Sequence, residues 1–177
     1  MNNTLASLFS LDGLANQAAV AEQILSLNEK LEQYGLFLTP ADAAALMQTR
    51  SEALTANGRI EVGSATIGKL IDAFCDSAYI NQRDYTATMH ELLEAFYYIK
   101  NETMDLLSDD DLIDFMRDCY ENRCMGSVEL LRGRELEKLA KNLRFGVENF
   151  RDMGYEQQYE EDGEEEPEFE EEEEDEQ

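Results

Sequence analysis

The sequence has few of the residues that catalytic and metal sites use most often. Its 177 residues include one histidine, three cysteines, two prolines and no tryptophan. A single histidine cannot supply the two imidazoles of a zinc-protease motif. An odd number of cysteines, here Cys75, Cys119 and Cys124, is not typical of a disulfide framework. We therefore expect reduced thiols and a cytosolic protein.

Long apolar runs are also absent. No stretch approaches the roughly eighteen consecutive apolar residues of a membrane span. A secretory signal begins with a basic region that precedes its apolar run. Residues 1–13 have no basic residue before their apolar positions, so they do not fit this pattern. We expect no membrane partner and a cytoplasmic location.

Basic residues are scarce: 14 stand against 40 acidic ones, and the net charge is −26. Residues 152–177 hold 16 acids and no base, so residues 1–151 carry a charge of −10. A field of this sign repels phosphate backbones, which disfavours nucleic acid as a partner. The Glu-rich composition of residues 152–177 predicts a disordered tail that follows one helical domain at residues 1–151.

The densest apolar content lies between Asp84 and Met125 and predicts two packed helices that meet at Ser108. Three aspartates follow Ser108, as expected for an N-cap residue and the acidic first turn of a helix. The expected core positions of the two helices are Met89, Leu92, Leu93, Phe96, Ile99 and Thr103, then Leu112, Ile113, Met116, Cys119 and Tyr120.

Further helices are expected on the N-terminal side of this pair. Residues 18–34 alternate apolar spacings of four and three, and Gly35 suits a left-handed helix terminus. Thr39 is the expected N-cap of a helix that has Pro40 at its first position and stops at Asn57. A helix capped by Ser64 follows, and a short one is expected within residues 2–9.

The last helix is expected after Ser127, with Gly133 as a position where it can kink. Arg59–Val62 is the one convincing extended stretch, and its expected partner is Tyr79–Ile80. The predicted fold is mainly α: a single domain of six or seven packed helices, with at most one very short two-stranded element.

Two near-matches to ligand-binding loops lack the groups that their ligands need. Gly63–Lys69 has the spacing of a phosphate-binding loop, but Leu70 stands where a hydroxyl should bind magnesium. The stretch around Gly58 resembles a calcium loop in spacing, yet it lacks the carboxylates and the final glutamate that hold calcium. We interpret the first as a helix N-terminus and expect no calcium binding at the second.

His90, Glu91 and Glu94 are weak candidates for a metal site. They place an imidazole and a carboxylate four residues apart, but Glu94 stands where a zinc protease has a second histidine. Cys119 and Cys124 are about 140° apart around a helix, so they cannot chelate one ion unless the helix breaks. We expect no catalytic residue, no metal and no cofactor.

The only basic part of this acidic chain lies between Arg123 and Arg151, with seven bases and four acids. Helical spacing places Arg134, Lys138 and Lys141 opposite the apolar stripe of the last helix, so they should face solvent. They are the candidate interaction residues.

Three segments carry a resemblance to a known family: Ala73–Ile80, Glu91–Glu102 and Leu107–Ile113. In these three segments the chain resembles an uncharacterised family of small proteins from anaerobic Gram-positive bacteria, known only as a domain of unknown function. The resemblance covers about Ala18 to Phe145 and implies a bacterial, cytosolic protein. No chemistry is assigned to these motifs, so the resemblance transfers no site residues.

Of the function classes, a non-enzymatic protein-interaction or regulatory protein is favoured, with another protein as its partner. One alternative is an acidic mimic of nucleic acid that occupies a basic partner protein. A second alternative is a metal-dependent enzyme centred on His90.

Overall fold

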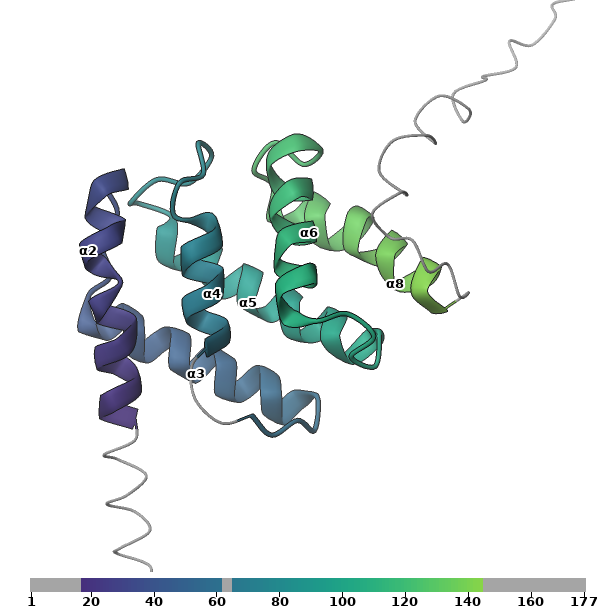
Figure 1. The fold of residues 1–177 in the computed structure, drawn as a ribbon, viewed down its shortest axis with the longest axis horizontal. Helices are drawn as coiled ribbons and strands as arrows, with labels where there is room; N and C mark the ends of the chain where they lie inside the picture. The colour runs from purple at the N-terminus through teal and green to yellow at the C-terminus, as the bar shows by residue number, and fades with distance from the viewer. Residues whose placement is uncertain (1–16, 62–64, 145–177) are drawn as a thin grey trace, which may run out of the picture.

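The protein is built from helices that pack around one core. A computed structural model describes residues 17–61 and 65–144, and these residues contain no β-strand. The helices, shown in Figure 1, are residues 17–26, α2 (Asn28–Leu31) with the 3₁₀ turn η1 (Glu32–Tyr34), α3 (Pro40–Ala56), α4 (Ala65–Phe74), α5 (Tyr85–Glu102), α6 (Asp109–Asn122), α7 (Val128–Leu130), the π-helical segment η2 (Leu131–Leu136) and α8 (Glu137–Arg144). The mainly α prediction is confirmed.

Local sequence sets the ends of these helices. The side chain of Thr39 accepts a hydrogen bond from the amide of Asp42, and the Asp42 carboxylate accepts one from the amide of Thr39. This reciprocal capping box begins α3, with Pro40 at its first position. Ser108 caps α6 with a single such bond, which its side chain accepts from the amide of Asp111. Gly35 ends η1 in the left-handed conformation, with φ of 72°. All three ends were predicted.

The core is centred on α5 and α6. Every side chain predicted for the core of these two helices is no more than 3% exposed. Phe96 and Met116 are both fully buried, and Leu93 joins them in the same cluster. The helix pair around Ser108 is therefore the hydrophobic centre of the molecule, as the spacing predicts.

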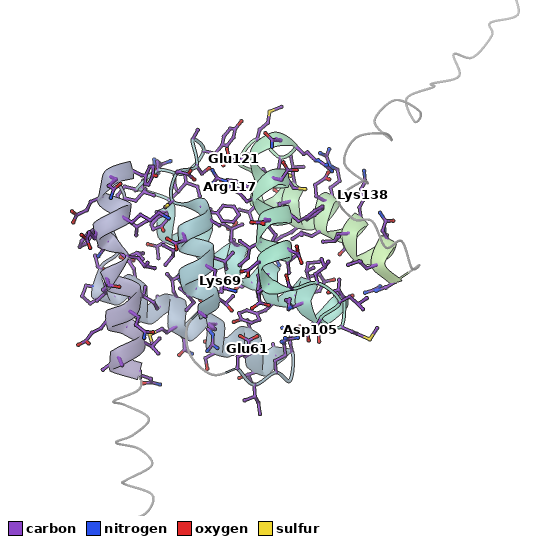
Figure 2. All side chains as sticks on the ribbon, in the orientation of Figure 1. Glu61, Lys69, Asp105, Arg117, Glu121 and Lys138 are labelled. Carbon is purple, nitrogen blue, oxygen red and sulfur yellow. The ribbon has the colours of Figure 1, made fainter. Side chains whose placement is uncertain are left out.

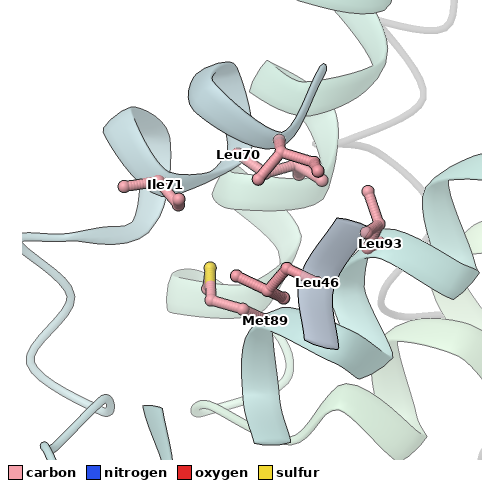
Figure 3. A pocket seen from close by; sticks show the side chains of 6 residues that line it. Leu46, Leu70, Ile71, Met89 and Leu93 are labelled. Atoms are coloured by element: carbon pink, nitrogen blue, oxygen red, sulfur yellow. The ribbon is translucent and has the colours of Figure 1, made fainter. Parts of the chain in front are cut away.

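The other helices pack around this centre. α3 packs most extensively on α5, and α4 lies against α6 (Figure 1). Where α3, α4 and α5 meet, Leu46, Leu70 and Met89 are among the apolar residues that line a space with no room for a water molecule (Figure 3). This junction is packed core and not a ligand pocket.

Two predicted helices are divided in the structure. The helix expected over residues 18–34 turns at Leu27 and tightens to a 3₁₀ turn, so Tyr34 leaves the apolar stripe and is 48% exposed. The last helix passes through the π-helical segment η2, which contains Gly133. The weak helix propensity of glycine explains why the regular hydrogen-bond pattern changes there.

The short two-stranded element does not form among the described residues. Arg59–Glu61 are irregular, Ile60 is 95% exposed, and Tyr79 lies in a turn. The short helix at residues 2–9, the Ser64 cap and the tail at 152–177 lie outside the described residues, as do Val62 and the domain boundary at residue 151.

Candidate functional site

Lys138 and Lys141 on α8 differ from every other described cation. Both are exposed, and neither makes an ion pair with a residue in the described ranges (Figure 2 labels Lys138). Each of the other lysines and arginines within 17–61 and 65–144 makes at least one ion pair with a carboxylate. Lys138 and Lys141 are three residues apart, so they lie side by side on one face of the helix.

The packing of α8 explains why this face is presented to solvent. Leu139 and Ala140 are 1% and 4% exposed and form the opposite, inward side of the helix. Two contacts attach α8 to α5: the Arg144–Glu102 ion pair, and a hydrogen bond of 3.4 Å that the Tyr98 hydroxyl donates to Glu137. The described end of α8 lies far from α2, at the other side of the molecule (Figure 1).

Arg134 is exposed as predicted but has partners. Its Nε donates to Glu135 at 2.6 Å, and its Nη2 donates to the backbone carbonyl of Arg123 at 3.3 Å. Glu135 is only 5% exposed and also pairs with Arg123 at 3.3 Å. Arg134 therefore helps to neutralise a buried carboxylate, so it is less available to an external ligand than Lys138 and Lys141.

The three weak metal candidates point toward three different neighbours. The His90 Nδ1 lies 2.5 Å from the Thr49 hydroxyl of α3, whereas Glu94 lies 3.8 Å from Arg132 of the π-helical segment. Glu91 is exposed, and its charge acts on Tyr120 of α6: burial, followed by the charges of Glu121 and Glu91, raises the pKa of Tyr120 to about 12. In the part of the chain that the structure describes, no three His, Cys, Asp or Glu side chains are placed to hold a metal ion.

The helix that carries Cys119 does not continue to Cys124. α6 ends at Asn122, between the two, and the amide of Cys124 donates to the carbonyl of Cys119 at 2.9 Å. Both thiols are buried, and burial raises their pKa values, to about 12 for Cys119. A thiol with a raised pKa is a poor nucleophile at neutral pH because little of it is thiolate.

The residues that resemble a phosphate-binding loop take other roles. Leu70 is 2% exposed in the core, and the ammonium group of Lys69 pairs with Asp110 of α6 at 2.7 Å (Figure 2 labels Lys69). Residues 62–64 lie outside the described part of the chain. Lys69 thus joins α4 to α6.

A polar cluster between the turns after α3 and α5 was not foreseen. The Tyr97 hydroxyl donates to Glu61 at 2.8 Å, and Arg59 contacts both Glu61 and Asp105 (Figure 2 labels Glu61 and Asp105). Lys100 is 5% exposed and pairs with Asp105 at 3.1 Å.

The sequence did contain a signal for the burial of Lys100, because that residue lies four positions after Phe96 on the same helix face. The buried ammonium group also donates to the Leu107 carbonyl at 2.7 Å and pairs with Asp109 at 3.0 Å. These partners hold the connection between α5 and α6 in place.

A family model matches residues 23–149, which is more than half of the chain. The chain belongs to DUF6323, a family of unknown function. Comparison with curated proteins and with solved structures finds no match. The DUF6323 match includes Lys138 and Lys141 and excludes the Glu-rich residues 152–177. No described helix of this DUF6323 protein is long and apolar enough to cross a membrane.

Proposed function

We propose that this DUF6323 chain is a non-enzymatic protein-interaction or regulatory protein that binds an acidic segment of a partner protein. The site is the α8 face formed by Lys138 and Lys141, called here the lysine face. The observation that carries the proposal is that these two lysines are exposed and without an ion pair among the described residues, in a strongly acidic chain. An acidic ligand would supply the opposite charges that the described part of the chain does not supply.

Two further features support this proposal. The lysine face directly follows a π-helical segment. Such segments are rare in proteins overall, and those that occur are often found at functional sites. Tyr98 is 43% exposed, and its hydroxyl bonds to Glu137, the residue before Lys138. Its ring therefore offers an apolar surface at the edge of the lysine face. The free, buried thiols of Cys75, Cys119 and Cys124 favour a reducing cytosol as the setting. The bacterial host belongs to the proposal through the family resemblance alone.

Binding of a fluorescent oligo-glutamate peptide to the full chain, followed by anisotropy at low salt, tests the proposal. Each exposed ion pair contributes at most about 1 kcal/mol, so losing two should weaken binding by roughly tenfold. We expect this loss for the double variant Lys138→Gln/Lys141→Gln. Affinity should also fall as salt is raised, because the contacts are exposed and screened.

The matched control is Lys30→Gln/Lys69→Gln, which removes the same charge from two lysines that pair with Asp72 and Asp110 and whose side chains are 45% and 41% exposed. We expect its affinity for the peptide to stay close to that of the unmodified chain. Equal affinity of the two double variants would overturn the assignment of the lysine face, because net charge alone would then explain the binding.

A further inference from the structure

The chain carries its own acidic segment, which lies close in sequence to the lysine face. We infer that residues 156–177 occupy this face in cis and compete there with an external acidic partner. The inference rests on the proposed function and adds to it a form of regulation, in which the free site is partly closed by the same chain.

Charge complementarity is the first support for this occupant. Residues 152–177 contain 16 carboxylates and no lysine or arginine, so this segment cannot neutralise its charge internally. Lys138 and Lys141 are the cations of the described ranges that have no carboxylate partner within those ranges. The segment richest in unmatched acid and the only unmatched bases of the described chain therefore lie close together in sequence.

Chain length is the second support. Along α8, Arg144 lies about 9 Å from Lys138, at 1.5 Å per residue. Glu160 lies sixteen positions after Arg144. Such a length can span up to about 50 Å when extended, so the acidic residues can return to the lysine face without displacing any described helix.

Covalent attachment compensates for the weakness of each contact. An exposed lysine–carboxylate pair contributes at most about 1 kcal/mol and is screened beyond about 8 Å at physiological ionic strength. Tethering, however, raises the effective concentration of the segment to roughly the millimolar range. Because glutamates recur along the segment, many registers place a carboxylate against the two lysines. The contact is then exchangeable, and a partner with a better-matched acidic surface displaces it.

The experiment uses full chains that differ only in the tail. In one variant the glutamates at 164–166 and 170–174 become Gln, which removes eight negative charges. In the control the same eight become Asp, which keeps the charge at every position. Both chains are compared with the unmodified protein by anisotropy with the oligo-glutamate peptide at low salt, and by the NMR shifts of the Lys138 and Lys141 ammonium groups.

We expect the Gln variant to bind the peptide severalfold to tenfold more tightly than the unmodified chain and the Asp variant to bind as the unmodified chain does. The two ammonium shifts should move in the Gln variant alone. Placing the Gln tail on the Lys138→Gln/Lys141→Gln background should abolish the gain. If the gain persists on that background, the tail merely repels the peptide and the inference is overturned.

The remaining outcomes separate the inference from the proposed function. If the Gln variant and the unmodified chain bind the peptide equally, and both need the two lysines, the contact in cis is refuted and the proposed function stands. If no chain binds the peptide but the ammonium shifts still respond to the Gln tail, the contact in cis stands and the proposed function fails.

Discussion

Arg59 and Asp105 form a two-point ion pair although they are 46 positions apart in the sequence. Nη1 and Nη2 of Arg59 each donate to one carboxylate oxygen of Asp105, both at 2.8 Å. The pair joins the turn after α3 to the turn after α5. Asp105 and the preceding Met104 both have positive φ, 59° and 50°, a conformation that is unfavourable for residues with a Cβ. The ion pair stabilises this backbone.

The first prediction concerns Asp105→Asn, which we expect to lower the free energy of unfolding by about 1 kcal/mol at pH 7. The effect is modest because the Asp105 side chain is 49% exposed and solvent screens the pair. The hydrogen bond from Arg59, aided by Lys100, lowers the pKa of Asp105 below its ordinary 3.8. The unfolded state therefore binds the proton more readily, and the contribution is full above pH 3.8 and lost as pH falls through the lower folded pKa.

Urea unfolding of the unmodified protein and the Asp105→Asn variant between pH 3 and pH 7 measures this contribution. The stability difference should be constant at higher pH and should shrink as the solution becomes more acidic than the ordinary carboxyl pKa. A difference that grows on acidification would contradict the assigned pairing. Asp114→Asn is a suitable control, since Asp114 is an exposed residue of the neighbouring helix α6.

The second prediction concerns the centre of the core. Phe96 is fully buried and contacts the Tyr97 ring edge to face, with centroids 5.3 Å apart. Phe96→Ala should lower the free energy of unfolding by about 3–5 kcal/mol, because it removes apolar contacts and leaves a cavity. The control is Tyr98→Ala on the same helix, where the ring is 43% exposed and the loss should be much smaller. Chemical denaturation measures both, and similar losses would show that the orientation of α5 is wrong.

The sequence was sufficient to predict features that depend on near neighbours. The caps at Thr39 and Ser108 depend on residues within three positions, and the burial of Phe96 and Met116 depends on helical spacing alone. The expected extent of the family resemblance, Ala18 to Phe145, is close to the matched residues 23–149. This agreement also comes from near neighbours, because the resemblance rests on short local motifs.

Features that depend on the meeting of distant elements could not be predicted. The Arg59–Asp105 pair needs two turns to come together, and no local pattern encodes that contact. The candidate site shows the same limit. Helical spacing predicts that Arg134, Lys138 and Lys141 are all exposed, which is correct. Only the structure separates Arg134, which pairs with the buried Glu135, from the two lysines, which make no ion pair with any residue that the structure describes.

The third prediction concerns the thiols. Cys75, Cys119 and Cys124 are all buried, and burial raises the pKa of each. The thiolate is the form that reacts with a disulfide reagent such as dithiobis(nitrobenzoate). This reagent should therefore modify the three thiols slowly in the folded protein at pH 8 and rapidly in the protein unfolded by urea. Ser51→Cys, at an exposed position of α3, should add one fast-reacting thiol to the folded protein. Immediate reaction of three thiols in the unmodified folded chain would show that the thiols are accessible.

The last prediction compares two glycines. Gly126 has φ of 80°, and a Cβ there would lie 2.3 Å from the Cβ of Tyr79, which stacks edge to face on Tyr120. Gly126→Ala should therefore lower the free energy of unfolding by about 2 kcal/mol or more, from backbone strain and from displacement of Tyr79. Gly133 has neither constraint, because nothing lies within 4 Å of its added Cβ.

Gly133→Ala should instead raise stability by about 0.4–1 kcal/mol, since alanine restricts the unfolded chain and favours helix. The same substitution, glycine to alanine, is thus expected to lower stability at one position and raise it at the other. Thermal or urea unfolding of the two variants measures both changes. If Gly126→Ala were as stable as the unmodified protein, the turn between α6 and α7 would not approach Tyr79 as described. If Gly133→Ala were destabilising, the π-helical segment would need the freedom of glycine, and the presentation of Lys138 and Lys141 would depend on that residue.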